Sequence, residues 1–366
     1  MRIGILGGGQ LGRMLALAGH PIGIACRTLE PAAVCPASPV AEHFSGDYED
    51  LQALFRFCQG LDAVTYEFEN VPVESARWLA ERLPVFPPPI ALKIGQERVR
   101  EKTFFKELGV PVPPFAAVET RAEFDQAIRL IGLPAVLKTS RFGYDGKGQT
   151  VIRDANDVEL AWQALGGRPL ILEGFVPFDR ELSILGVRGR DGECVFYPLT
   201  ENVHRAGILR QSTAPAMHVS DAMQNQAQDI ARRAMAAMNY VGVLAVELFQ
   251  IGDQLLVNEM APRVHNSGHW TIEGAETSQF ENHLRAVAGL PLGSTASRGH
   301  SVMFNLIGDW PPPAGVLAIA GAHLHLYGKT PRPGRKVGHI TVRADSTWAL
   351  GEAVAQVRVL VDGSES

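Results

Sequence analysis

The chain has 366 residues, of which 46% are hydrophobic and 20% charged, and this composition excludes intrinsic disorder as a description of the whole protein. The formal net charge of −5 argues against a nucleic-acid binder, because following a phosphate backbone requires an excess of cationic side chains. The four cysteines form no metal-ligand or disulfide pattern, and no targeting or membrane-spanning segment is visible. We therefore expect a cytoplasmic protein that does not bind membranes, with two or three domains.

The N-terminal region alternates short apolar runs with helical patterns, which is typical of a parallel α/β sheet. Strands are predicted over residues 2–6, 22–26 and 62–66, and helices over residues 11–18 and 51–58. The pattern predicts a doubly wound, Rossmann-like domain over residues 1–100. Next to a Pro-rich segment, a charged amphipathic helix is predicted over residues 90–108, and it marks the domain boundary.

The following segment predicts a small α+β unit. Thr120 and Glu123 form a capping box that opens a helix ending near Gly132. Strands over residues 134–138, 150–152 and 170–172 and a helix over residues 157–165 complete the unit. We expect a lid subdomain over residues 112–172, within a larger domain that covers residues 101–290.

The rest of that larger domain is predicted to be rich in strands. Strands are expected over residues 182–187 and 195–199, a helix over residues 222–238, and an antiparallel hairpin over residues 244–251 and 254–259. From Gly299 short strands and turns follow, and they predict a small β-rich C-terminal domain over residues 291–366.

A GxGxxG motif stands between the first strand and the first helix. It runs from Gly7 to Gly12, and backbone N–H groups at such a helix start can hold a phosphate. The same glycines can instead serve only close strand-to-helix packing. Glu30 follows where a dinucleotide fold places its ribose-binding acid, so a nicotinamide-dependent oxidoreductase remains an alternative.

A second Gly-rich loop spans residues 140–149 and follows Lys138 on the preceding strand. Three glycines with Lys147 suit a mobile flap over phosphates. The loop is not a Walker A motif, because Gly148 stands where that motif requires Ser or Thr. The alternative is an ordinary turn at a hairpin tip.

Two glutamates are predicted to face each other across the antiparallel hairpin. A three-residue turn at residues 252–254 pairs Ile251 with Leu255, and this register places Glu247 opposite Glu259. Facing carboxylates destabilise a sheet unless a cation lies between them, and magnesium with nucleotide phosphates suits this role. A two-residue turn would place Asn258 opposite Glu247, and a solvated acidic edge is a further alternative.

Two other segments concentrate donors and cations. Residues 260–270 follow the glutamate hairpin directly and include Arg263, which can hold a small oxyanion through two hydrogen bonds. Residues 327–336 bring four cations into a turn-rich stretch of an acidic protein. The alternative for this second segment is a solubilising surface loop.

Taken in order, these features resemble the ATP-grasp superfamily, most closely the 5-(carboxyamino)imidazole ribonucleotide synthetases. The resemblance runs over nearly the whole chain, and its most specific segments are residues 7–14, 143–149, 173–176 with Glu181, 258–271 and 332–339. It implies an ATP-grasp fold, of mixed α/β and α+β class, with an N-terminal preATP-grasp domain, a lid and a small β-rich C-terminal domain.

The resemblance also implies a reaction of de novo purine biosynthesis. ATP, magnesium and bicarbonate give carboxyphosphate, and the carboxyl group passes to the amine of 5-aminoimidazole ribonucleotide with release of ADP and phosphate. The implied enzyme is a homodimer that uses neither NAD nor biotin. Another ATP-grasp ligase acting on a different phosphorylated amine, and a nucleotide sensor without catalysis, are the alternatives.

The resemblance assigns site residues position by position. ATP phosphates would be contacted by Arg98, Lys138, Gly143, Tyr144, Asp145, Gly146, Lys147, Gly148 and Gln149. The adenine edge, the ribose and the rest of the nucleotide would be contacted by Glu173, Gly174, Phe175, Val176, Glu181, His204 and Asn258. Glu247 and Glu259 would hold magnesium, and Arg263, His265 and Asn266 would orient bicarbonate or carboxyphosphate. The ribonucleotide would be bound by Gly8, Gln10, Leu11, Glu67, Lys329, Arg335 and Lys336.

Overall fold

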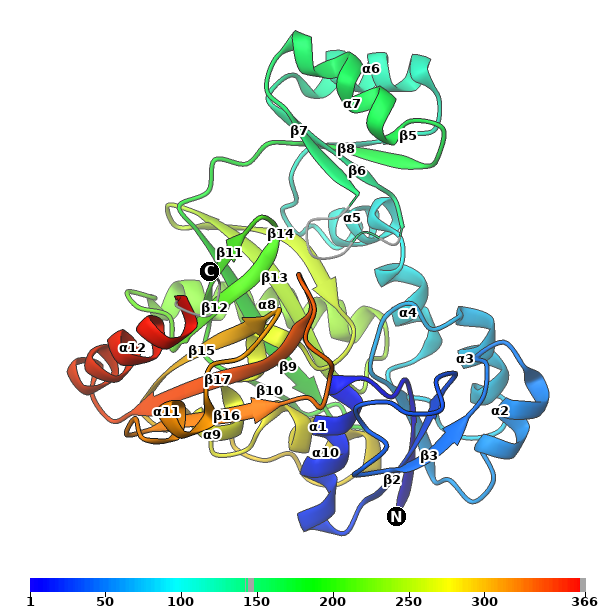
Figure 1. Cartoon of the computed structure of the whole chain (residues 1–366). Helices are drawn as coiled ribbons and strands as arrows, with labels where there is room; N and C mark the ends of the chain where they lie inside the picture. The colour runs from blue at the N-terminus through cyan, green and yellow to red at the C-terminus, as the bar shows by residue number, and fades with distance from the viewer. Residues whose placement is uncertain (142, 144–147, 363–366) are drawn as a thin grey trace.

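The computed structural model describes residues 1–141, 143 and 148–362. Within this part of the chain the strands form three sheets: an N-terminal parallel sheet, a small antiparallel sheet and a large sheet of nine strands (Figure 1). The mixed α/β and α+β class that the sequence predicts is confirmed. No helix among these described residues is long and apolar enough to cross a membrane.

The N-terminal sheet is parallel, as predicted, with strand order β3-β2-β1-β4. Its elements are β1 (Arg2–Leu6), α1 (Gln10–Gly19), η1 (His20–Ile22), β2 (Ala25–Glu30), β3 (Glu42–Ser45), α2 (Leu51–Phe57), β4 (Ala63–Tyr66) and α3 (Val73–Ala80). The second strand begins three residues later than predicted. The physical reason is the 3-10 turn η1, which ends at Gly23 in the left-handed conformation with a φ of 73°.

The helix predicted over residues 90–108 is two helices, α4 (Pro89–Gly95) and α5 (Arg98–Glu107). Glu97 is extended, with φ −133° and ψ 111°, and this interrupts the helix. The side chain of Gln96 donates to the backbone carbonyls of Glu69, at 2.8 Å, and Val71, at 2.7 Å. The break makes Arg98 the first residue of α5 and turns that helix toward the lid.

The lid subdomain stands away from the rest of the molecule (Figure 1). Its sheet is antiparallel in the order β5-β8-β6-β7. The elements are β5 (Phe115–Val118), α6 (Arg121–Ile131), β6 (Ala135–Thr139), β7 (Gln149–Ile152), α7 (Ala155–Leu165) and β8 (Leu170–Gly174). The predicted capping box of Thr120 and Glu123 is confirmed. Both helices pack on one face of the sheet, where Phe124 stacks on Trp162 with ring centroids 5.4 Å apart.

The large sheet has the order β14-β13-β9-β11-β12-β15-β17-β16, with β10 paired to β9. Its strands are β9 (Arg180–Arg188), β10 (Cys194–Phe196), β11 (Thr200–Arg205), β12 (Ile208–Ala214), β13 (Gly242–Ile251), β14 (Gln254–Ala261), β15 (His300–Ile307), β16 (Ala322–Leu326) and β17 (Lys336–Ala344). Its helices are α8 (Asp221–Ala237), η2 (Asn266–Gly268), α9 (Thr271–Gly274), α10 (Gln279–Ala288), α11 (Pro313–Leu317) and α12 (Thr347–Asp362). The C-terminal strands therefore continue the central sheet through the pairing of β12 with β15.

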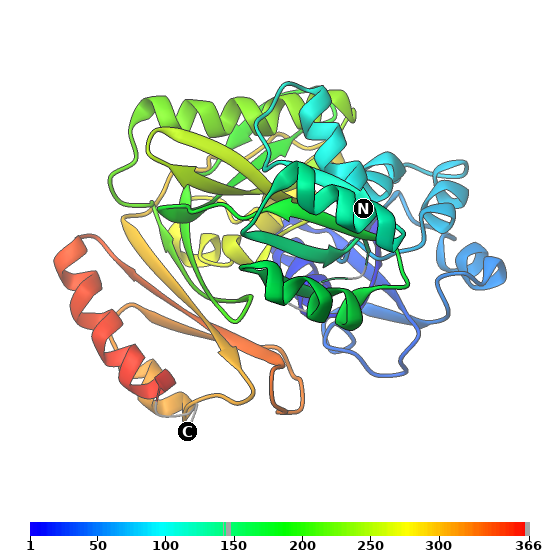
Figure 2. The same cartoon turned by 90° about the horizontal axis from the view of Figure 1, so that it is seen from above.

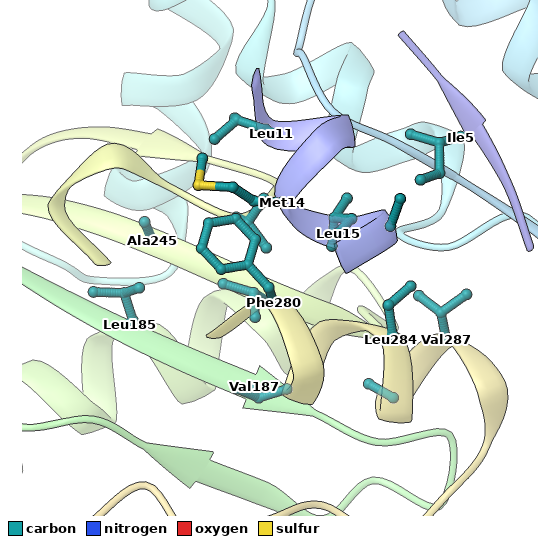
Figure 3. Packing of buried hydrophobic residues seen from close by; sticks show 14 of the residues in the cluster. Ile5, Leu11, Met14, Leu15, Leu185, Val187, Ala245, Phe280, Leu284 and Val287 are labelled. Carbon is teal, nitrogen blue, oxygen red and sulfur yellow. The ribbon is translucent and has the colours of Figure 1, made fainter. Parts of the chain in front are cut away.

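A shared core joins the N-terminal sheet to the large sheet. Met14 and Leu15 of α1 belong to the same buried cluster as Phe280 and Leu284 of α10 and Leu185 of β9 (Figure 3). Seen from above, the lid helices lie over the N-terminal sheet in projection, and the C-terminal strands lie to one side of both (Figure 2). This packing holds the glycine motif at the start of α1 beside the large sheet.

Candidate functional site

A cleft of about 600 Å³ lies where the N-terminal sheet, the lid and the large sheet meet. The predicted site residues that line it are Gln10, Leu11, Glu67, Arg98, Lys138, Gly143, Gln149, Glu173, Gly174, Phe175, Val176, Glu181, His204, Glu247, Asn258, Glu259, Arg263, His265, Asn266 and Lys336. Gly8, Gly148, Lys329 and Arg335 do not line it. Tyr144, Asp145, Gly146 and Lys147 lie outside the described residues.

The facing glutamates are present, but the predicted turn is wrong. The hairpin closes with a two-residue turn, because Ile251 pairs with Gln254. A β-bulge then adds one residue to β14, so that Leu248 pairs with Val257 while Glu247 pairs with Glu259. The extra residue is Asn258. The bulge therefore places Glu247 opposite Glu259, the same pairing that a three-residue turn without a bulge would give.

The two carboxylates differ in their surroundings. Burial and the negative charge of Glu259 raise the pKa of Glu247 from its ordinary value of 4.5 to about 7. Burial acts in the same direction on Glu259, but the guanidinium of Arg98, 3.0 Å away, outweighs it and lowers the pKa of that carboxyl. Glu259 is thus ion-paired with an arginine, whereas Glu247 holds a negative charge only at a cost.

The oxygen atoms around this pair are suitable ligands for magnesium. The amide oxygen of Asn258 is buried and accepts no hydrogen bond from the described residues. Asn258 precedes Glu259 on β14 and lines the same cleft as both carboxylates, and oxygen atoms are the ligands that magnesium prefers. The described residues provide no group of three or more His, Cys, Asp or Glu side chains for a metal ion. A magnesium ion here would take its remaining ligands from water or substrate oxygens.

Lysines from two elements converge on the buried carboxylate of Glu173 in β8. Its Oε2 lies 3.0 Å from the Nζ of Lys138 and 3.6 Å from the Nζ of Lys102. Burial raises the pKa of Glu173, but the two ammonium groups outweigh burial and lower it. The Glu173 carboxylate is therefore ion-paired with two lysines, and its contact with the adenine edge remains a prediction.

Beyond the lid, Glu181 of β9 contacts His204 of β11. The Nδ1 of His204 lies 2.8 Å from the Oε2 of Glu181. Burial lowers the pKa of His204, but this hydrogen bond and the nearby carboxylate of Glu247 outweigh burial and raise it. A protonated His204 would add a positive charge to this wall of the cleft.

The donor-rich loop after β14 has one arginine held in place. The Nε of Arg263 donates to Glu69, and its Nη1 donates to the backbone carbonyl of Val264 at 3.1 Å. Burial raises the pKa of Glu69, but Arg263 outweighs it and lowers that pKa to about 2. Both groups are therefore charged at neutral pH, and Nη2 of Arg263 donates no hydrogen bond to the described residues.

The neighbouring polar residues of this loop are neutral. Burial and the charge of Arg263 lower the pKa of His265 to about 3, and its Nε2 lies 3.5 Å from Glu247. Both amide atoms of Asn266 are buried without a hydrogen-bond partner among the described residues. Burying polar atoms without a hydrogen-bond partner costs free energy, so Asn266 is well suited to bind a polar substrate.

The glycine motif binds a carboxylate of the chain itself. Glu67 accepts the N–H of Gly9 at 2.5 Å and that of Gly12 at 2.7 Å, so in this structure these two donors are used by the chain itself, and phosphate binding at them remains a prediction. Glu30, the acid of the dinucleotide alternative, accepts the N–H of Gly8 at 3.2 Å and the hydroxyl of Tyr48 at 2.8 Å. Both features of the oxidoreductase alternative are thus used inside the protein.

The C-terminal cations reach back to this motif. The Nζ of Lys329 donates to the side chain of Gln10, and burial together with Arg335 lowers the pKa of Lys329 to about 8. Lys336 begins β17 and lines the cleft. The guanidinium of Arg335 donates to the carbonyl of Thr330 at 3.1 Å. Lys329 and Lys336 therefore lie against the site, whereas residues 330–334 between them are exposed, as expected for the alternative of a solubilising surface loop.

Three site residues were missed by the sequence reasoning: Glu69, Glu101 and Lys102. Glu101 accepts the backbone N–H of Met260 at 2.6 Å, next to the acidic pair. Arg98, Glu101 and Lys102 share one face of α5, since residues three and four apart are neighbours on a helix. This spacing can be seen in the sequence, but it does not single out these three residues, because α5 carries charged residues on its other faces as well.

Comparisons with known proteins agree along the chain. Residues 1–96 match the ribonucleotide synthetase preATP-grasp domain, residues 103–280 the ATP-grasp domain, and residues 301–353 the phosphoribosylaminoimidazole carboxylase C-terminal domain. The N5-carboxyaminoimidazole ribonucleotide synthase of Pseudomonas aeruginosa is 53% identical over 362 residues, covering 99% of this chain and 100% of that protein.

Solved structures support the same grouping. The crystal structure of the N5-carboxyaminoimidazole ribonucleotide synthetase from Thermus thermophilus has a TM-score of 0.95 at 61% identity and covers 98% of both chains. The synthase from Aspergillus clavatus, in complex with ADP and 5-aminoimidazole ribonucleotide, has a TM-score of 0.90 at 34% identity, with 99% of this chain and 97% of that chain covered. The chain therefore belongs to the N5-carboxyaminoimidazole ribonucleotide synthase family of the ATP-grasp superfamily.

Proposed function

We propose that this cleft carries out the reaction of its family within one connected site. ATP and bicarbonate give ADP and carboxyphosphate, whose carboxyl group passes to the exocyclic amine of 5-aminoimidazole ribonucleotide with release of phosphate. The chain is accordingly an ADP-forming, ATP-dependent ligase of purine biosynthesis. The observation that carries the proposal is that one cleft joins the acidic pair, the Arg263 loop and the glycine motif.

Magnesium is part of this proposal. Glu247, Glu259 and the amide oxygen of Asn258 would hold it, since burial and Glu259 raise the pKa of Glu247 and that oxygen accepts no hydrogen bond from the described residues. When bound, magnesium would neutralise charge on the phosphates of ATP.

The nucleotide is held by cations from two sides. Arg98 reaches from α5 to Glu259, and Lys138 projects from β6 toward Glu173, so both cations border the cleft between the lid and the large sheet. Phosphoryl transfer needs positioning and charge neutralisation more than covalent help from the protein. No serine or cysteine nucleophile is needed. The oxygen of bicarbonate attacks the γ-phosphorus, and the bond to ADP breaks.

Bicarbonate is oriented by the loop after β14. Arg263, fixed by Glu69, offers Nη2 to an oxyanion, and the amide of Asn266 offers both a donor and an acceptor. His265 is neutral at working pH because of burial and Arg263, so it does not compete with Arg263 for the anion. Carboxyphosphate hydrolyses readily in water, and a closed cleft would protect it.

The ribonucleotide lies at the opposite end of the cleft in this proposal. Gln10, Leu11 and Glu67 border that end, and Lys336 supplies a cation for the 5′-phosphate. Lys329 and Arg335 extend the positive charge just outside the lining. The proposal also includes that the protein is a cytoplasmic homodimer that uses neither NAD nor biotin. Size-exclusion chromatography with light scattering checks the oligomeric state.

The test is to measure ADP release while small molecules are added one at a time. ADP release should require bicarbonate and rise when 5-aminoimidazole ribonucleotide is added, but not when other phosphorylated amines are added. A stronger response to another phosphorylated amine would assign the chain to a different ATP-grasp ligase. ADP release that is independent of bicarbonate would rule out the carboxyphosphate route.

A further inference from the structure

A fully buried lysine lies outside the set of residues that contact substrate in the proposed reaction. The side chain of Lys102 in α5 is 1% exposed. Its Nζ donates to the backbone carbonyls of Asn258 at 2.5 Å and Val257 at 3.2 Å, and it lies 3.6 Å from the carboxylate of Glu173. A buried ammonium group is costly unless such acceptors compensate it, so its position is closely determined.

Lys102 connects two parts of the nucleotide site that belong to different sheets. Asn258 lies on β14 of the large sheet, whereas Glu173 lies on β8 of the lid. Helix α5, which carries Lys102, lies between the lid and the large sheet (Figure 1). The side chain therefore ties the lid to the strand that carries the magnesium-binding glutamate Glu259.

Charge is also shared at this junction. The carboxylate of Glu173 has two cations within ion-pair distance, Lys138 at 3.0 Å and Lys102 at 3.6 Å. A lysine has three N–H donors, and Lys138 uses one of them on Glu173. Without Lys102, Lys138 would be the lysine left to balance the negative charge of Glu173. Lys138 would then be drawn away from the phosphates.

We infer that Lys102 is a positioning residue for ATP, which neutralises Glu173 so that Lys138 is available to the phosphates and which fixes the backbone of Asn258 beside the nucleotide. The inference rests on the proposed function, since that proposal gives Lys138 and Asn258 their contacts with ATP. Lys102 itself contacts no substrate.

The experiment compares Lys102→Met with Lys106→Met, a control at an exposed lysine one turn further along α5. Steady-state kinetics are measured with ATP and with 5-aminoimidazole ribonucleotide varied in turn, and ADP binding is measured by calorimetry. Lys102→Met should raise KM for ATP and Kd for ADP by about tenfold, the size expected for one charge-assisted contact. KM for the ribonucleotide should stay within about twofold, and Lys106→Met should change neither value.

A double-mutant cycle tests the route through the carboxylate. If Lys102 acts by neutralising Glu173, the loss of ATP affinity caused by Lys102→Met should be smaller in a Glu173→Gln background. A merely structural lysine would lower the melting temperature and change both KM values alike. Equal effects on the two substrates, or unchanged ADP affinity, would overturn the inference.

Lys138→Met separates this inference from the proposed function. If Lys138→Met leaves KM for ATP unchanged, the proposed nucleotide site is wrong. If Lys138→Met raises that KM and Lys102→Met does not, only the role of Lys102 is wrong. Should Lys102→Met fail to fold, Lys102→Gln, which keeps a hydrogen-bond donor but no charge, takes its place in the same comparison.

Discussion

Replacing Glu247 by glutamine should remove activity and yet stabilise the metal-free protein. The carboxylate of Glu247 lies opposite that of Glu259, and its side chain is only 14% exposed. Without a cation the folded protein holds this charge at a cost, whereas glutamine has nearly the same shape and no charge. Activity should fall because a magnesium ligand is lost.

The size of the stabilisation follows from the pKa of Glu247. Burial and Glu259 raise that pKa from 4.5 to about 7, which corresponds to about 3 kcal/mol, since each pKa unit is about 1.4 kcal/mol. The folded state binds the proton more tightly than the unfolded state. The cost is therefore absent below pH 4.5, grows as the pH rises to about 7, and is complete above it.

The assay is urea unfolding at pH 8 with a chelator, repeated with excess magnesium. Glu247→Gln should raise the free energy of unfolding by about 3 kcal/mol at most in chelator, and the gain should shrink with magnesium. Glu259→Gln should not stabilise, because Arg98, 3.0 Å from Glu259, would lose its partner. Both variants should lose ADP production.

Glu193→Gln, at an exposed carboxylate of the β9–β10 connection, is the matched control and should behave like the unmodified protein. The reasoning would be refuted if Glu247→Gln were no more stable than the unmodified protein in chelator, or if it kept near-normal turnover at modest magnesium. The first result would contradict the electrostatic argument, and the second would contradict the metal assignment.

Three further predictions concern other parts of the molecule. Arg335→Ala or Lys336→Ala should raise KM for 5-aminoimidazole ribonucleotide by about tenfold with little change in KM for ATP, since a hydrogen bond from a cation to a phosphate contributes about 1.5–3 kcal/mol. Steady-state kinetics with each substrate varied in turn would show this, and a selective loss of ATP affinity would contradict it. Glu67→Gln should lower the free energy of unfolding in urea by about 2 kcal/mol, because Gly9 and Gly12 donate to different oxygens of the carboxylate and the amide nitrogen of glutamine cannot accept a hydrogen bond. An unchanged midpoint would argue against this helix-start contact. Burial lowers the pKa of His283 to about 3, so the unfolded chain binds the proton more readily between pH 6.5 and 3, and stability should fall by about 1.4 kcal/mol per pH unit as the pH drops through that window. His283→Gln should flatten that acid dependence in thermal melts, and an equally steep dependence would assign it to other groups.

Much of the fold was predictable because its signals are local. Strand and helix patterns identified the parallel N-terminal sheet and the lid, and the capping box at Thr120 predicted the start of α6 correctly. The break before Arg98 was not predictable. It depends on hydrogen bonds from Gln96 to the carbonyls of Glu69 and Val71, which are distant in sequence.

The acidic pair shows how a correct strand pairing can rest on an incorrect local argument. The sequence alternation placed Glu247 and Glu259 on facing strands, but the turn has two residues, not three. Only the bulge at Asn258 brings the carboxylates together, and a bulge is decided by the packing of both strands against their neighbours. The motif order along the chain, by contrast, was enough to identify the ATP-grasp family.

The sequence by itself determined the order of elements, the residue types of the site and the family, because periodicity, turns and motifs are read over short stretches of chain. Only the tertiary structure decided which charges meet. Glu67 binds the glycine motif, Lys329 reaches Gln10, and Lys102 is buried between the lid and β14. These contacts join residues 55 to 319 positions apart, and their geometry depends on how the sheets pack.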